Sequence, residues 1–128
     1  MAPARLIRVA VPVVGIEAAA AFYSAVLDDP GRRISAGRHY FGCGHAILAC
    51  VDARADGDTS DHPPNPDHLY LAVQDLERCL ERVQAAGGAV QRTIETQPWG
   101  EHSFFCTDPF GNKLCFVDEP TMFRAGLI

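Results

Sequence analysis

The chain contains an internal repeat, and this repeat limits its fold more than any other feature. The segment RVAVPVVGIEAAAAFYSAV, which begins at Arg8, aligns without a gap on HLYLAVQDLERCLERVQAA, which begins at His68. In each copy the apolar residues first alternate and then recur at helical spacing, a pattern typical of a strand followed by an amphipathic helix. The sequence therefore predicts two β-α units, one starting at Arg8 and one at His68.

Further strand-like segments follow each expected helix: RHYF and AILACVD in the first half, and AVQRTIE, HSFFCT and KLCFVDE in the second. The segment ARADGDTSDHPPNPD between the halves is rich in Asp, Pro and Gly, which indicates a solvated connection. We expect a single domain, residues 1–128, made of a first β-α-β-β-β module at about 5–52, a connecting loop at 53–67, a second module at 68–119 and a C-terminal tail at 120–128.

Composition argues against several classes of function. The formal net charge is −5 and Lys113 is the only lysine, so no basic stripe is present and nucleic acid is not an expected partner. No apolar run reaches the length of a membrane span, and the N-terminal residues lack the pattern of a signal peptide, so we expect a cytoplasmic protein without membrane contact. The five cysteines include no C-x-x-C pair and predict free thiols.

The paired modules, and above all the segment QPWGEHSFFCTDPFGNKLCFVDE from Gln97, resemble the vicinal oxygen chelate superfamily. This superfamily includes glyoxalase I, extradiol dioxygenases, fosfomycin-resistance transferases and bleomycin-resistance proteins. The resemblance runs from about Ile7 to Glu119, and Pro109 and Gly111 suit the fixed and positive backbone angles of its D-P-x-G-N turn. It implies an α+β fold in which two β-α-β-β-β modules form curved mixed sheets around a cleft.

The resemblance also implies where a metal would be held, by one side chain from the first and last strands of each half, usually His, Glu or Gln. These positions correspond to Arg8, Ala49, His68 and Cys115. Arginine stays protonated and alanine has no donor atom. His68 is the one ligand of the family type that is retained, and Cys115 stands where the family has Glu. We therefore expect no metal and no cofactor, with a divalent metal at His68 and Cys115 as the alternative.

These replacements favour a metal-free, small-molecule-binding protein of the bleomycin-resistance type, which sequesters its ligand without covalent chemistry. The alternative is a glyoxalase-like lyase or isomerase, or a dioxygenase, with an atypical metal site at His68. A structural dimer with a filled cleft is a third interpretation. We assign no catalytic residue from the sequence.

Strand alternation predicts that Arg8, His68, Tyr70 and Cys115 lie on the sheet face opposite the helices, and the resemblance places Trp99 at the edge of the cleft. Together they suit a planar or aromatic small molecule with a polar end. Four of them also have a structural interpretation: a core or rim histidine for His68, a subunit contact for Arg8, packing at the cleft mouth for Trp99 and an inert buried thiol for Cys115. We expect a homodimer, because these faces carry few large apolar residues and a second set of strands would close them.

Overall fold

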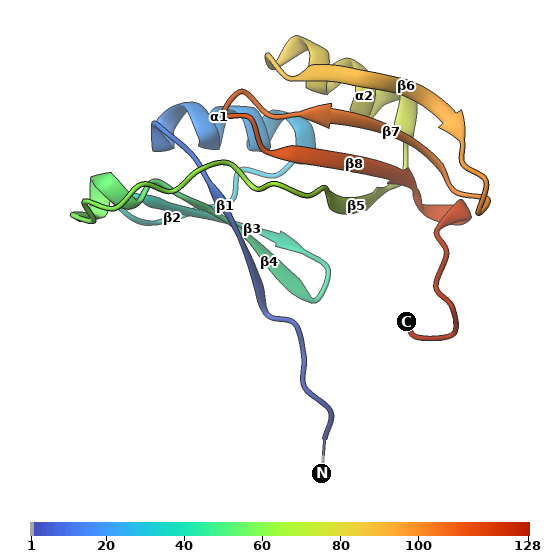
Figure 1. Cartoon of the computed structure of the whole chain (residues 1–128), viewed down its shortest axis with the longest axis horizontal. Coiled ribbons are helices and arrows are strands. Elements are labelled where there is room, and N and C mark those ends of the chain that lie inside the picture. The colour runs from blue at the N-terminus through green and yellow to red at the C-terminus, as the bar shows by residue number, and fades with distance from the viewer. Residues whose placement is uncertain (1) are drawn as a thin grey trace. The chain divides into compact units, whose positions relative to one another are not determined.

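The computed structural model describes residues 2–128, which form two four-stranded sheets with one helix each (Figure 1). The first half contains β1 (Arg8–Pro12), α1 (Ile16–Leu27), β2 (Arg32–Ser35), β3 (Arg38–Cys43), β4 (Ala46–Val51) and the short 3-10 helix η1 (Ala53–Asp56). The second half contains β5 (Leu69–Val73), α2 (Leu76–Ala85), β6 (Ala89–Thr96), β7 (His102–Thr107), β8 (Lys113–Asp118) and η2 (Glu119–Thr121). The expected α+β fold with two β-α-β-β-β arrangements is confirmed.

The two sheets have the same topology. Their strand orders are β1-β4-β3-β2 and β5-β8-β7-β6, and in each sheet the first strand runs parallel to the last while the other pairs are antiparallel. The chain divides into two compact units between Asn65 and Pro66. The internal repeat of the sequence is therefore a repeat of strand order and pairing.

The first unit builds its core between α1 and one face of its sheet. Alternation along β1 buries Val11 against the helix, while Phe22 and Tyr23 are the large buried residues of α1. Tyr23 contacts Phe22 edge-to-face, with ring centroids 4.9 Å apart. The backbone N–H of Gly15, just before the helix, donates to the Asp52 carboxylate at 3.0 Å, which ties α1 to the end of β4.

The second unit has an equivalent core beneath α2. Asp75 caps this helix by accepting from the backbone N–H of Arg78 at 3.1 Å, as its position in the sequence predicts. Cys79 is buried on the inner side of α2, and Phe104 of β7 stacks on Phe116 of β8 with centroids 5.3 Å apart. Within residues 2–128, no helix has both the length and the apolar character needed to cross a membrane.

A hydrogen-bonded turn joins β7 to β8 at the D-P-F-G-N segment. Asp108 Oδ1 accepts from the backbone N–H groups of Phe110 and Asn112 at 2.9 and 2.8 Å, and Oδ2 accepts from the Asn112 side chain at 2.8 Å. Gly111 adopts a φ of 91°, a conformation that favours glycine. The turn fixes the direction in which β8 starts, and with it the side chain of Lys113.

Candidate functional site

The second sheet has one face that its helix does not cover, and strand pairing decides which residues lie there. Cys115 of β8 lies directly opposite Tyr70 of β5 and Phe105 of β7, and Phe105 lies opposite Arg92 of β6. Paired residues share a face of a sheet, so these four side chains lie on one side. The buried, stacked Phe104 lies on the other side.

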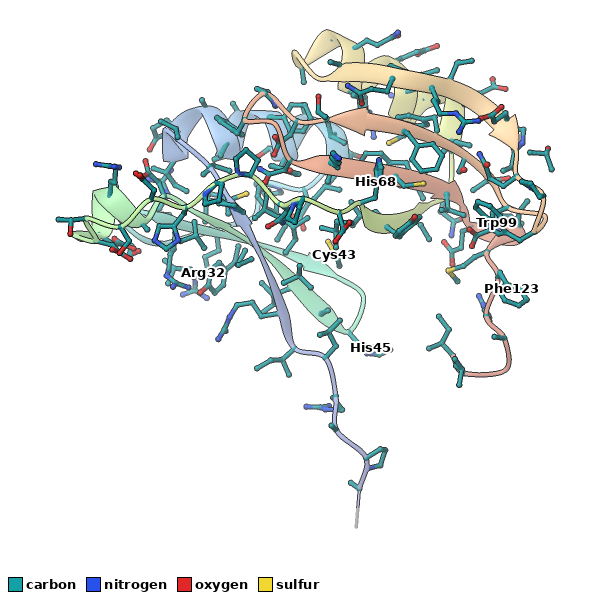
Figure 2. All side chains as sticks on the ribbon, in the orientation of Figure 1. Arg32, Cys43, His45, His68, Trp99 and Phe123 are labelled. Atoms are coloured by element: carbon teal, nitrogen blue, oxygen red, sulfur yellow. The ribbon has the colours of Figure 1, made fainter. Side chains whose placement is uncertain are left out.

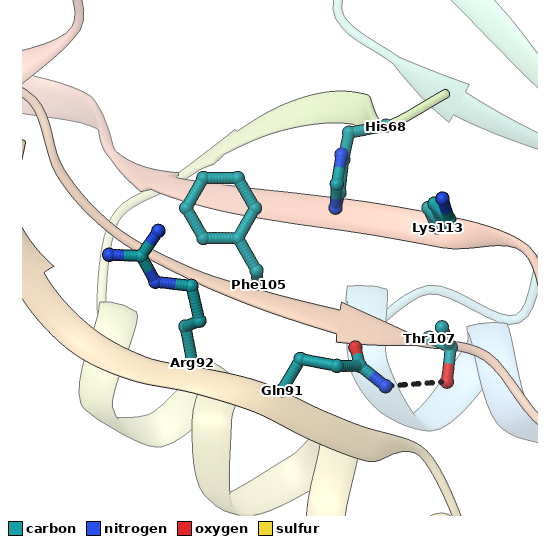
Figure 3. A pocket seen from close by; sticks show the side chains of 6 residues that line it. All are labelled: His68, Gln91, Arg92, Phe105, Thr107 and Lys113. Carbon is teal, nitrogen blue, oxygen red and sulfur yellow. Dashed lines mark hydrogen bonds between the residues drawn. The ribbon is translucent and has the colours of Figure 1, made fainter. Parts of the chain in front are cut away.

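A cavity of about 390 Å³ opens on this helix-free face, within the second unit. His68, just before β5, packs edge-to-face on Phe105, with ring centroids 5.0 Å apart (Figure 3). The guanidinium of Arg92 lies 5.8 Å from the centroid of the same ring. The full lining consists of His68, Gln91, Arg92, Phe105, Thr107 and Lys113. A cavity with an aromatic surface and convergent polar groups is the usual form of a small-molecule site.

The cavity is lined by two cationic side chains although the chain as a whole is acidic. Arg92 and Lys113 lie in the lining beside the imidazole of His68, and none of these described lining residues is acidic. Arg92 forms an ion pair with Glu95 further along β6. Within residues 2–128 the side chain of Lys113 has neither a hydrogen bond nor an ion pair, and it is exposed. The charge of Lys113 is therefore available to a bound anion.

Cys115 is positioned on the same face but does not line the cavity. It is 1% exposed, and burial raises the pKa of its thiol to about 11, although a side-chain hydrogen bond with Ser103 acts in the opposite direction. The raised pKa disfavours the thiolate at neutral pH, and with it nucleophilic attack by Cys115. These observations agree with an inert buried thiol.

Tyr70 and Trp99 also lie outside the cavity lining. Tyr70 is 59% exposed, with its ring centroid 6.4 Å from that of His68. Trp99 is 52% exposed in the turn between β6 and β7, where its indole N–H donates to Glu101 Oε1 at 2.7 Å. This turn precedes His102, whereas the cavity lining includes Thr107 at the other end of β7. Figure 2 shows Trp99 at the end of the sheet, away from His68.

Arg8 belongs to the first unit, where it occupies the position that His68 has in the second. Its guanidinium lies 5.8 Å from the centroid of the Tyr40 ring. The Tyr40 hydroxyl accepts from Arg38 Nη1 at 2.8 Å, and Arg38 in turn lies 4.0 Å from the Asp56 carboxylate. Tyr40 pairs with Ala49 as Phe105 pairs with Cys115, so each sheet places an aromatic ring near the start of its first strand, beside Arg8 in one sheet and beside His68 in the other.

The four positions at which the resemblance implies metal ligands do not fit a divalent metal. Arg8 contributes a cation, and Ala49 is fully buried with no donor atom. Cys115 is a buried thiol where the resemblance implies a carboxylate, and His68 is left as the single ligand of the usual type. In the part of the chain that the structure describes, no three His, Cys, Asp or Glu side chains gather as a metal site would require.

Of the cavity lining, the sequence identified His68 and missed the other five residues. Phe105 could have been found by extending the alternation of HSFFCT from the buried Phe104. Lys113 could have been found from its place two residues before Cys115 on the same face. Gln91 and Arg92 are adjacent in one strand, and both reach the cavity because β6 is irregular between Val90 and Arg92.

The comparisons with known proteins agree with this architecture. A glyoxalase-related enzyme from Fulvimarina pelagi superposes with a TM-score of 0.76 at 20% identity, covering 91% of this chain and 88% of that one. A glyoxalase/bleomycin resistance protein from Albidiferax ferrireducens T118 gives 0.72 at 23%, covering 88% and 98%. Lactoylglutathione lyase from Agrobacterium tumefaciens gives 0.66 at 21%, covering 91% and 94%.

At these identities the structures show a common fold. A comparison with curated protein sequences gave no match. The model of the Glyoxalase/Bleomycin resistance protein/Dioxygenase superfamily matches residues 5–116, which is most of the chain. The protein therefore belongs to the Glyoxalase/Bleomycin resistance protein/Dioxygenase superfamily.

Proposed function

We propose that this protein binds a small molecule without the help of a divalent metal, and that binding rather than catalysis is its function. The observation that carries the proposal is the identity of the side chains at the four positions where the resemblance implies metal ligands. At the four positions that would hold a metal, Arg8 and Ala49 cannot ligate, and Cys115 is buried with a raised pKa. A positive charge at Arg8 would also repel a divalent cation nearby.

The cavity of the second unit supports binding of a planar molecule. Its volume of about 390 Å³ suits a compound of modest size, and the Phe105 ring offers an aromatic surface. His68 packs on that ring, which gives its imidazole a defined orientation for a hydrogen bond. In this proposal Tyr70 and Trp99 remain candidates for further ligand contacts in the second unit, and Cys115 supports the sheet beneath. Arg8 remains a candidate for ligand contacts in the first unit.

The metal content of the purified protein tests the proposal. Protein prepared without chelator is expected to hold much less than one equivalent of zinc, iron, manganese or nickel by elemental mass spectrometry. A modest excess of these metals is expected to leave the melting temperature unchanged, because a ligand that does not bind the folded state does not stabilise it.

One tightly held metal per chain would contradict the proposal and favour a metal-dependent lyase, isomerase or oxygenase. His68→Ala would then abolish the metal, whereas His62→Ala would retain it. His62 is a matched control because it lies in the exposed connecting segment and contacts Asp58.

The same proposal includes a homodimer. Tyr70 and Ile34 are large apolar side chains left half-exposed on strands, and a second copy of the chain would cover such surfaces. Light scattering over a wide range of concentrations is expected to give twice the mass of the chain. A monomer at every concentration would contradict the homodimer and would leave the proposal of metal-free binding unaffected.

A further inference from the structure

We propose that the cavity of the second unit binds a planar organic anion, whose carboxylate pairs with Lys113 and whose flat body lies against Phe105. This inference rests on the proposed function and specifies its ligand class. Both residues line the cavity and reach it from neighbouring strands, β8 and β7 (Figure 3).

The charge of the cavity lining favours an anionic ligand. The chain as a whole carries a formal net charge of −5, yet the described lining residues include Lys113, Arg92 and His68 and no carboxylate. Arg92 is already paired with Glu95, whereas the side chain of Lys113 has no ion pair or hydrogen bond within residues 2–128. A carboxylate that entered the cavity would therefore meet an ammonium group with free donors.

The lining also offers an aromatic surface, the ring of Phe105. Phe105 is half-buried, whereas its neighbours in β7, Phe104 and Cys106, are completely buried. The Arg92 guanidinium and the His68 ring hold Phe105 from two sides, at 5.8 and 5.0 Å between centres. A ring with its orientation fixed in this way offers a flat apolar surface on which a planar ligand can stack.

The remaining polar side chains define the rim. Gln91 donates from its amide to the Thr107 hydroxyl at 3.4 Å, which joins the neighbouring strands β6 and β7. Neither side chain carries a charge, so neither offsets the charge of Lys113. The ligand chemistry that matches the whole lining is a flat, mostly apolar molecule with one negative group.

A pair of probes with the same flat body and different charge tests this inference: 2-naphthoate, which is anionic, and 2-naphthamide, which is neutral. Titration calorimetry on the full chain is expected to show naphthoate binding at least tenfold more tightly. Lys113→Met is expected to weaken naphthoate at least fivefold and to leave naphthamide unchanged. Phe105→Leu is expected to weaken both probes, because it removes the stacking surface.

Arg78→Met is the matched control. Arg78 is exposed on α2, on the helix-covered side of the sheet, and its loss changes the net charge by the same amount as the loss of Lys113. If Arg78→Met weakened naphthoate as much as Lys113→Met, the overall field rather than the cavity would be responsible, and the inference would be overturned.

Equal affinity for the two probes, or no binding of naphthoate at millimolar concentration, would also overturn the inference. Neither result would affect the proposed function, which the metal content decides separately. Melting temperatures of all variants identify any loss of fold, and exposed Lys113 and Arg78 are expected to be replaceable without such a loss.

Discussion

Replacing Asp108 by alanine should destabilise the protein more than any exposed polar substitution, because one carboxylate holds the turn between β7 and β8. Its two oxygens accept from Phe110 N–H at 2.9 Å, from Asn112 N–H at 2.8 Å and from the Asn112 side chain at 2.8 Å. Asp108 is 3% exposed and Asn112 is 0% exposed. The substitution thus leaves three donors without this acceptor, two of them inaccessible to water.

The magnitude follows from where those donors lie. A buried donor deprived of its partner costs about 1–3 kcal/mol, whereas a donor that regains water costs much less. Phe110 is half-buried and can be rehydrated, but the two donors of Asn112 cannot. The expected loss in the free energy of unfolding is about 3–5 kcal/mol in total. This is a large share of the ~5–15 kcal/mol by which folded domains are stable.

Urea unfolding followed by far-ultraviolet circular dichroism measures this loss. Asp75→Ala is the control, since Asp75 accepts a single exposed N–H at the start of α2 and its removal should cost about 1 kcal/mol. A loss for Asp108→Ala no larger than for Asp75→Ala would refute the reasoning. The turn would then be held by its backbone geometry alone.

Two further changes probe backbone space and buried thiols. Gly37→Ala should lower the free energy of unfolding, measured in urea, by more than about 2 kcal/mol, because a Cβ there would lie 2.1 Å from the Asp52 carbonyl oxygen. Gly42→Ala is the control and should lower it by less than about 1 kcal/mol, because nothing lies within 4 Å of a Cβ at that position. Equal losses would contradict this reasoning. Burial raises the pKa of Cys79 and Cys106 from 9.0 to about 12, so the folded chain retains thiol protons that the unfolded chain releases. The free energy of unfolding should therefore be insensitive to these thiols below pH 9 and fall as pH rises toward 12, by at most about 1.4 kcal/mol per pH unit and thiol. Cys106→Ala should make that decline shallower, and an unchanged slope would show that this thiol is not responsible.

The first strand of each sheet was predictable from the sequence because its apolar residues alternate, and exposure alternates along β1 and β5 in the structure. Alternation located β1 and β5, and the gap-free repeat placed both helices at matching positions. β2 could not be recognised in this way. It has no buried residue, Ile34 is half-exposed, and pairing with β3 is what holds it in place, with an irregularity between Arg33 and Ser35. A strand without a buried face leaves no periodic pattern to read.

The site was less predictable, because its lining depends on pairing details. His68 was identified from the resemblance, but Phe105 enters the cavity through its pairing opposite Cys115. Gln91 and Arg92 both line the cavity although consecutive residues of a regular strand point to opposite faces. The irregularity in β6 makes this possible, and simple alternation does not reveal it.

The shared pairing of the two sheets makes each half an internal reference for the other. Arg8 beside Tyr40 and His68 beside Phe105 occupy corresponding positions of the repeat on sheets with the same strand pairing, so their side-chain chemistry can be compared directly. Arginine can only donate hydrogen bonds, whereas histidine can donate and accept. A double variant in which Arg8 and His68 are exchanged would therefore place the donor-only side chain in the second half and the donor-acceptor side chain in the first. Binding by that one variant would show the effect of both replacements.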